Sequence, residues 1–171
     1  PDSMALLNLL SVYKYSNKLD KLNVLPVIID HQLRENSDAE ALQVKQFAEG
    51  LGFKTLIKKI NSKLPTGNIQ NWARIKRRSI LIEESKKYNA NLFLAHHQDD
   101  QIETIFMRLI KGSGFYGLIG MNWCQNWQGT MIYRPLLSMS KEKILNYVIE
   151  NNIFYVNDPS NNDLRFERIR T

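Results

Sequence analysis

The chain has 171 residues, of which 23 are Lys or Arg and 17 are Asp or Glu, so its formal charge is +6. Apolar residues make up 43% and charged residues 23%, a balance typical of a folded globular domain and not of a disordered one. The apolar runs are far shorter than the roughly 20 residues that span a bilayer, which excludes a membrane helix. Cys124 is the single cysteine, which excludes an internal disulfide and a four-cysteine zinc site. Because the first residue is Pro1 and not methionine, we expect the chain to be part of a longer protein.

The apolar spacing alternates along the chain between the helical period and short continuous runs. The helices that this pattern predicts are, in chain order, 3–15, 37–51, 69–88, 99–111 and 140–151, and the strands are 24–29, 53–58, 91–95 and 130–137. Repeated strand–helix units are typical of parallel strands joined by right-handed crossovers. We therefore expect an α/β fold with an open, mostly parallel twisted sheet, helices on both faces, and a site at the carboxyl ends of the strands.

The boundaries of the helix at 37–51 have local signals. The segment Ser37-Asp38-Ala39-Glu40 matches the capping box, in which a hydroxyl and a carboxylate each accept a hydrogen bond from an otherwise free amide. This predicts Ser37 as the N-cap. Gly52 is expected to end the helix, since glycine adopts the left-handed C-terminal conformation without strain.

Polar side chains follow two of the predicted strands, where an α/β site lies. One group is Asp-His-Gln-Leu-Arg at 30–34, and the other is Ala-His-His-Gln-Asp-Asp-Gln-Ile-Glu-Thr at 95–104. Asp100 and Glu103 are three residues apart on one helix face, so they could bind a cationic amine, hold Mg²⁺ or transfer a proton. The alternative is that Asp99 and Asp100 only stabilise the helix N-terminus through its dipole.

Two further groups have both an ordinary and a functional interpretation. His96 and His97 are candidate metal ligands, but adjacent side chains at a strand end diverge and no third His or Cys lies at ligand spacing. We therefore expect no zinc site and a structural role for at least one of these histidines. Asp2 and Ser3 open the first helix, where they can be ordinary caps, although a helix start also binds anions through its free amides.

Basic side chains gather in two places. Arg74, Lys76, Arg77 and Arg78 lie near Trp72 in the sequence, and Arg165, Arg168 and Arg170 surround Phe166. The ordinary interpretation of each is a solvated surface. The alternative is contact with RNA phosphates, with Phe166 as a stacking ring.

Several segments in order resemble one family, the tRNA(Ile)-lysidine synthetases of the N-type ATP-pyrophosphatase (PP-loop) superfamily. The segments that carry the resemblance are 1–7 (PDSMALL), 30–34 (DHQLR) with 37–40 (SDAE), 73–74 (AR), 95–104 (AHHQDDQIET) with 108–114 (RLIKGSG), 134–137 (RPLL) and 158–161 (DPSN). Two departures stand out. The Ser-Gly-Gly that precedes Asp2-Ser3 in the family's loop is absent together with its strand, and the family's Arg-Asn-x-Ile-Arg ending is represented by Arg168-Ile169-Arg170 without the asparagine.

The resemblance implies a Rossmann-like, adenine nucleotide alpha hydrolase-like fold with its first strand truncated. It implies an ATP-pyrophosphatase core at 1–138 and a helical extension at 139–171. The implied reaction is the ATP-dependent ligation of lysine to the wobble cytidine of tRNA(Ile), through an adenylylated cytidine, so that the anticodon reads AUA. The implied cofactors are ATP and Mg²⁺, the partners are tRNA(Ile) with a CAU anticodon and L-lysine, and the enzyme is cytoplasmic, binds no membrane and is expected as a homodimer.

The resemblance also implies roles for individual residues. The expected ATP-binding residues are Pro1, Asp2, Ser3, His31, Arg34 and His96, with Asp2 also a Mg²⁺ ligand. Asp100 and Glu103 are expected to bind lysine and act in catalysis together with Arg74, whose permanent positive charge would stabilise phosphate. The expected tRNA contacts are Arg165, Arg168 and Arg170.

Two rival functions remain at this point. A PP-loop tRNA thiolation enzyme commonly needs paired cysteines or an iron–sulfur cluster, and Cys124 stands alone, so this rival ranks below the ligase. The other rival is a nucleotide- or RNA-binding module without catalysis. The missing Ser-Gly-Gly favours it, whereas the Asp100/Glu103 pair favours an enzyme.

Overall fold

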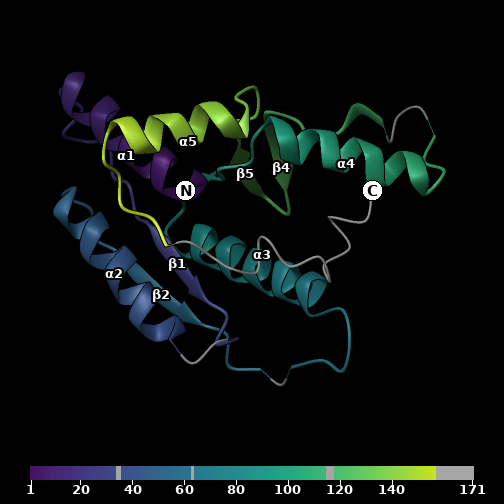
Figure 1. Cartoon of the computed structure of the whole chain (residues 1–171). Coiled ribbons are helices and arrows are strands. Elements are labelled where there is room, and N and C mark those ends of the chain that lie inside the picture. Colours follow the sequence, from purple (N-terminus) through teal and green to yellow (C-terminus); the bar gives the residue numbers. More distant parts are fainter. Residues whose placement is uncertain (34–35, 63, 115–117, 157–171) are drawn as a thin grey trace.

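The computed structural model describes residues 1–33, 36–62, 64–114 and 118–156 (Figure 1). The helices are α1 (Asp2–Ser16), α2 (Ser37–Gly50), α3 (Ile69–Lys87), α4 (Gln98–Ile110) and α5 (Lys141–Glu150). The strands are β1 (Val27–Asp30), β2 (Leu56–Lys59), β3 (Leu92–Phe93), β4 (Cys124–Trp127) and β5 (Thr130–Tyr133). All five expected helices are present, and none in the described part of the chain is long and apolar enough to cross a membrane.

The described strands form two hydrogen-bonded sheets. β1 pairs in parallel with β2, and β3 pairs in parallel with β5, whose other edge pairs antiparallel with β4. The α/β class with parallel strands is therefore confirmed. The single open sheet is not found in the described residues, because no described strand hydrogen-bonds to both β1 and β3 and so bridges the two sheets.

The strand β4 was missed by the sequence analysis, which expected only one strand at 130–137. β4 and β5 form a hairpin whose two-residue turn, Gln128 and Gly129, has positive φ at both positions (51° and 85°). Such a turn matches the twist of paired strands. β5 then ends at Tyr133, directly before Arg134 and Pro135, so the expected strand was too long.

The capping box predicted for α2 is wrong. The N-cap is Asn36, whose carbonyl accepts a hydrogen bond from the Glu40 amide at 3.1 Å, and no side chain caps the helix. Ser37 is thus the first residue inside the helix, one position too late for its hydroxyl to act as an N-cap. The other end follows the prediction: the helix ends at Gly50, and Gly52 has a left-handed φ of 81°.

The largest core cluster fixes α1 against α5. Its buried members are Met4, Ala5, Leu6, Leu136, Ile144, Val148 and Ile153. Because Met4 and Ala5 lie in the first turns of α1, this core also fixes the α1 N-terminus. The segment 136–139, which leads from this core into α5, also contacts the start of α4. There the Gln98 amide donates a hydrogen bond to the Met139 carbonyl at 2.9 Å.

We predict that Ile144→Ala lowers the free energy of unfolding of this chain by about 2–5 kcal/mol, because it removes buried methyl groups and leaves a cavity. Ile149→Ala is the matched control in the same helix, since Ile149 is 60% exposed whereas Ile144 is 3% exposed. The control should change stability by less than about 0.5 kcal/mol. Urea denaturation measures both, and equal losses would contradict the core assignment.

Candidate active site

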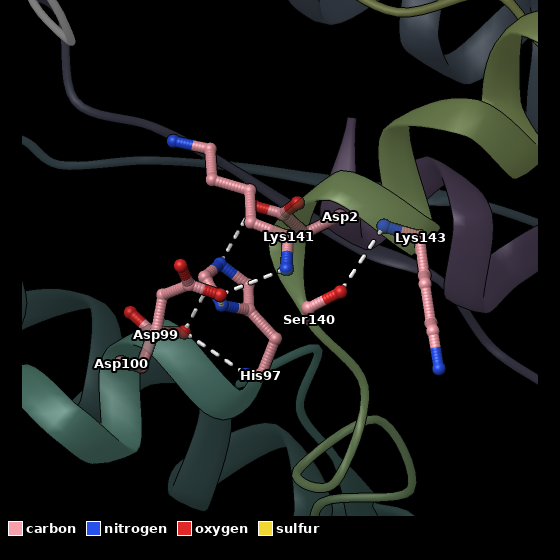
Figure 2. Close-up of polar contacts among 7 residues, drawn as sticks. All are labelled: Asp2, His97, Asp99, Asp100, Ser140, Lys141 and Lys143. Atoms are coloured by element: carbon pink, nitrogen blue, oxygen red, sulfur yellow. Dashed lines mark hydrogen bonds and ion pairs between the residues drawn. The ribbon is translucent and has the colours of Figure 1, made fainter.

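The N-termini of α1 and α4 meet at the imidazole of His97, which is only 6% exposed (Figure 2). His97 Nε2 lies 3.6 Å from Asp2 Oδ2 and 3.5 Å from Asp100 Oδ2. His97 Nδ1 lies 3.5 Å from Asp99 Oδ2. Three carboxylates from two helices therefore surround one buried imidazole, and Asp2 and Asp100 lie on the same side of the molecule.

Two of these carboxylates also hold helix ends. The His97 amide donates to Asp100 Oδ2 at 3.0 Å, which fixes the first turn of α4. The Lys141 amide donates to Asp99 Oδ2 at 2.8 Å, so Asp99 stabilises the start of α5 as well as lying at the start of α4. This contact supports the interpretation that Asp99 stabilises helix N-termini. Asp100 combines such a role with a position beside Asp2.

The second histidine of the pair lies in a basic environment. Arg134 Nε donates a hydrogen bond to His96 Nδ1 at 3.2 Å. Burial lowers the pKa of His96 to about 4, and the positive charges of Arg134, Arg77 and Arg74 act in the same direction, while Asp100 opposes them. His96 is therefore neutral throughout the physiological range.

His31, at the end of β1, belongs to the same neighbourhood. Its pKa is lowered mainly by burial and then by the charge of Arg77, which also acts on His96. The side chains that follow β1 and β3 are thus coupled electrostatically through one arginine of α3.

The other predicted site residues have no contact with His97 or His96 among those described above. Glu103 is exposed on α4, one turn after Asp100, and Ser3 is exposed in the first turn of α1. The Pro1 carbonyl accepts hydrogen bonds from the Met4 and Ala5 amides at the start of α1. Arg34, Arg165, Arg168 and Arg170 lie outside the described residues.

The contacts of His97 and Arg134 are not predicted by the sequence. The resemblance assigns His96, and not His97, to ATP, and nothing in the sequence indicates that His97 is the histidine that meets the carboxylates. Arg134 belongs to a family segment, but the strand expected at 130–137 contains it, so its position directly after β5 is seen only in the structure.

One carboxylate fits a divalent cation. Asp2 Oδ1 is buried and accepts no hydrogen bond from the described residues. In the same part of the chain, no group of three or more His, Cys, Asp or Glu side chains is placed to hold a metal ion. The free oxygen of Asp2 is the kind of ligand that Mg²⁺ takes where waters and substrate phosphates complete its coordination.

We predict that the imidazole resonances of His96 titrate with a midpoint near pH 4, well below the ordinary 6.5. Because the unfolded chain takes up this proton near pH 6.5 and the folded chain only near 4, the free energy of unfolding should fall as the pH drops through this window. Arg134→Gln should raise the midpoint, since it removes a nearby positive charge. An NMR titration measures it, and a midpoint at 6.5 in the unmodified chain would contradict the burial of His96.

Known proteins share much of this sequence. A tRNA(Ile)-lysidine synthase of Bradyrhizobium sp. strain BTAi1 is 37% identical over 171 residues, which cover 99% of this chain and 48% of that protein. A tRNA(Ile)-lysidine synthase of Wolbachia pipientis wMel is 38% identical over 171 residues, covering 98% of this chain and 39% of that protein. The chain thus spans less than half the length of these relatives.

A solved structure shares the fold. The U34-tRNA thiolase NcsA from Methanococcus maripaludis, with its 4Fe–4S cluster, superposes with a TM-score of 0.77 at 18% sequence identity, covering 92% of this chain and 55% of that one. The sequence model of the PP-loop domain matches residues 1–171. Because that match spans every residue of the sequence, the chain belongs to the PP-loop domain family.

Proposed function

We propose that the protein containing this chain ligates lysine to the wobble cytidine of tRNA(Ile). ATP adenylylates the oxygen on C2 of cytosine and releases pyrophosphate. The ε-amine of lysine then attacks C2, loses a proton and expels AMP, which leaves lysidine in an anticodon that reads AUA. The relatives named tRNA(Ile)-lysidine synthase support this proposal.

The observation that carries the proposal is the meeting of Asp2 and Asp100 at His97 Nε2, at 3.6 and 3.5 Å. It brings the start of α1, where an anion can bind, next to acidic side chains, where a cationic amine can bind. A ligase that joins an amine to a nucleotide-activated carbon needs these two kinds of site within reach of each other.

At the phosphate side, we assign Pro1, the N-cap of α1, and Asp2 and Ser3 in its first turn to ATP, since the helix dipole and free amides there favour phosphate. We assign His31, Arg34 and His96 to the same nucleotide. Arg74 is assigned to the charge that develops on phosphate as pyrophosphate leaves, since a guanidinium stays cationic at every relevant pH.

At the amine side, Asp100 and Glu103 are assigned to lysine. Their positions at i and i+3 on α4 place both carboxylates on one helix face. Such a pair can hold the ammonium group and accept the proton that the amine loses as it becomes nucleophilic.

Mg²⁺ fits the unpaired Oδ1 of Asp2. The cation would neutralise phosphate charge when bound. Asp2 would hold it, while its other oxygen, Oδ2, remains in contact with His97.

The wider assignments are part of the same proposal. We assign 1–138 to the nucleotide-binding core and 139–171 to a helical extension, which begins with α5 packed on α1. We assign Arg165, Arg168 and Arg170 to the tRNA, and the assembly to a cytoplasmic homodimer. Thiolation ranks lower because the 171 residues offer one thiol, Cys124, whereas an iron–sulfur cluster commonly takes four.

The direct test is pyrophosphate release by the full-length protein. We expect release that requires ATP and tRNA(Ile) with a CAU anticodon, and incorporation of lysine into that tRNA. A thiolation enzyme would release pyrophosphate without incorporating lysine, and a binding module would release none. Either result would overturn the proposal.

We predict that Asp100→Asn lowers lysine incorporation at least about 100-fold, because the neutral amide cannot balance the ammonium charge. Asn can still accept the hydrogen bond from the His97 amide, so tRNA binding should stay nearly unchanged.

Glu103→Gln should raise the KM for lysine more than the KM for ATP. Glu142→Gln, an exposed acid in the first turn of α5, is the control and should have no effect. Unchanged turnover in Asp100→Asn would refute its assigned role.

A further inference from the structure

Arg134 is a buried cation without an acidic partner in the described part of the chain. It is 6% exposed, and its guanidinium donates to three neutral acceptors: His96 Nδ1 at 3.2 Å, the Asn122 carbonyl at 2.7 Å and Gln125 Oε1 at 3.3 Å. Buried charges in proteins are normally paired with an opposite charge. These contacts orient Arg134, and none of the three acceptors carries a negative charge.

Arg78 is held near it in a similar way. Its guanidinium lies 3.3 Å from the centre of the Trp127 ring, a contact that fixes the side chain without neutralising it. Burial and the charge of Arg74 lower the pKa of Arg78. Arg78 and Arg134 both contact β4, through Trp127 and Gln125, and Arg74 lies one turn before Arg78 on α3. In line with this, burial lowers the pKa of Arg134, and the charges of Arg78 and Arg74 act in the same direction.

The β4–β5 hairpin supplies the neutral supports. Trp127 and Gln125 come from β4, and Arg134 directly follows β5. The hairpin also contacts α3, where the Ser85 and Thr130 hydroxyl oxygens lie 3.4 Å apart; the Ser85 hydroxyl donates to the Ala90 carbonyl, so it accepts from Thr130. A rigid scaffold thus brings cations from α3 and from the end of β5 together beside His96, at a cost in repulsion that an anion would relieve.

We propose that Arg74, Arg78 and Arg134 form a binding site for a phosphate group, with His96 as a further donor. Arg78 and Arg134 are new members of the site. The proposal rests on the proposed function only in that a substrate of the protein carries phosphate, either in the nucleotide or in the RNA backbone.

Arg134 also sets the tautomer of His96. A guanidinium has donors and no acceptor, so His96 Nδ1 must accept and the proton of the neutral ring must sit on Nε2. Nε2–H is then the donor that a phosphate oxygen can use. Arg134 therefore acts both as a ligand and as a positioning residue for His96.

The test measures binding of two probes to the full-length protein, inorganic pyrophosphate and an unmodified transcript of tRNA(Ile). Arg134→Gln and Arg78→Gln should each weaken at least one of them by about tenfold or more, as expected for the loss of a charged hydrogen bond. Loss for pyrophosphate alone assigns the site to the nucleotide, and loss for the transcript alone assigns it to the RNA backbone. Unchanged affinity for both probes in both variants overturns the proposal.

Arg108→Gln is the matched control. Arg108 also donates to a neutral carbonyl, that of Gly120 at 3.0 Å, but it lies in the last turn of α4, so its replacement removes the same charge elsewhere. An equal loss in this variant would mean a general charge effect and would also overturn the site.

If Arg134→Gln does not fold, Arg78→Gln decides alone, because Arg78 is less buried and its partner is a ring. Nitrogen-15 shifts of His96 should show the Nε2–H tautomer in the unmodified protein and a mixture in Arg134→Gln. The two proposals can fail separately. If the wild-type protein binds pyrophosphate and these variants do not, the site is supported. If the same wild-type protein incorporates no lysine into the tRNA, only the proposed function is overturned.

Discussion

The contact of the buried His97 imidazole with Asp2 and Asp100 organises this half of the molecule. It joins the first turn of α1 to the first turn of α4, two helices that are separated in the chain by β1, α2, β2, α3 and β3. Both helix starts carry partial positive charge, which favours carboxylates at this position. The core cluster behind α1 and α5 then holds the arrangement in place, because α5 begins at the Asp99 carboxylate.

The two adjacent histidines divide the site into an acidic and a basic side. The backbone at His97 is extended (φ −125°, ψ −177°), so neighbouring side chains point in opposite directions. His97 faces Asp2, Asp99 and Asp100, whereas His96 accepts from Arg134 in the arginine-rich region. A dipeptide at the end of β3 thus separates a region suited to an ammonium group from a region suited to phosphate. The proposed joining of an amine to a nucleotide-activated carbon would use both regions.

Local patterns predicted the helices well, because their apolar stripes and terminal residues are encoded within each segment. The placement of His31 directly after β1, and of His96 and Asp100 after β3, also followed from the α/β rhythm. β4 could not be predicted, since Cys-Gln-Asn-Trp has neither alternation nor β-branched residues and forms a strand only by pairing with β5. The different partners of His96 and His97 depend on packing between distant elements. The sequence predicted that the two side chains diverge. It did not predict that His97 would contact Asp2 and Asp100, or that His96 would accept a hydrogen bond from Arg134.

The central claim is that His97, at the start of α4, contacts Asp2, at the start of α1, and so joins the two helices. A double-mutant cycle on the free energy of unfolding tests it most directly. Asp2→Asn and His97→Gln are measured alone and together by urea denaturation. Residues in contact give non-additive effects, so we expect the double variant to differ from the sum of the single variants by about 0.5 kcal/mol or more. Additive effects, within about 0.3 kcal/mol, would contradict the contact and with it the shared site.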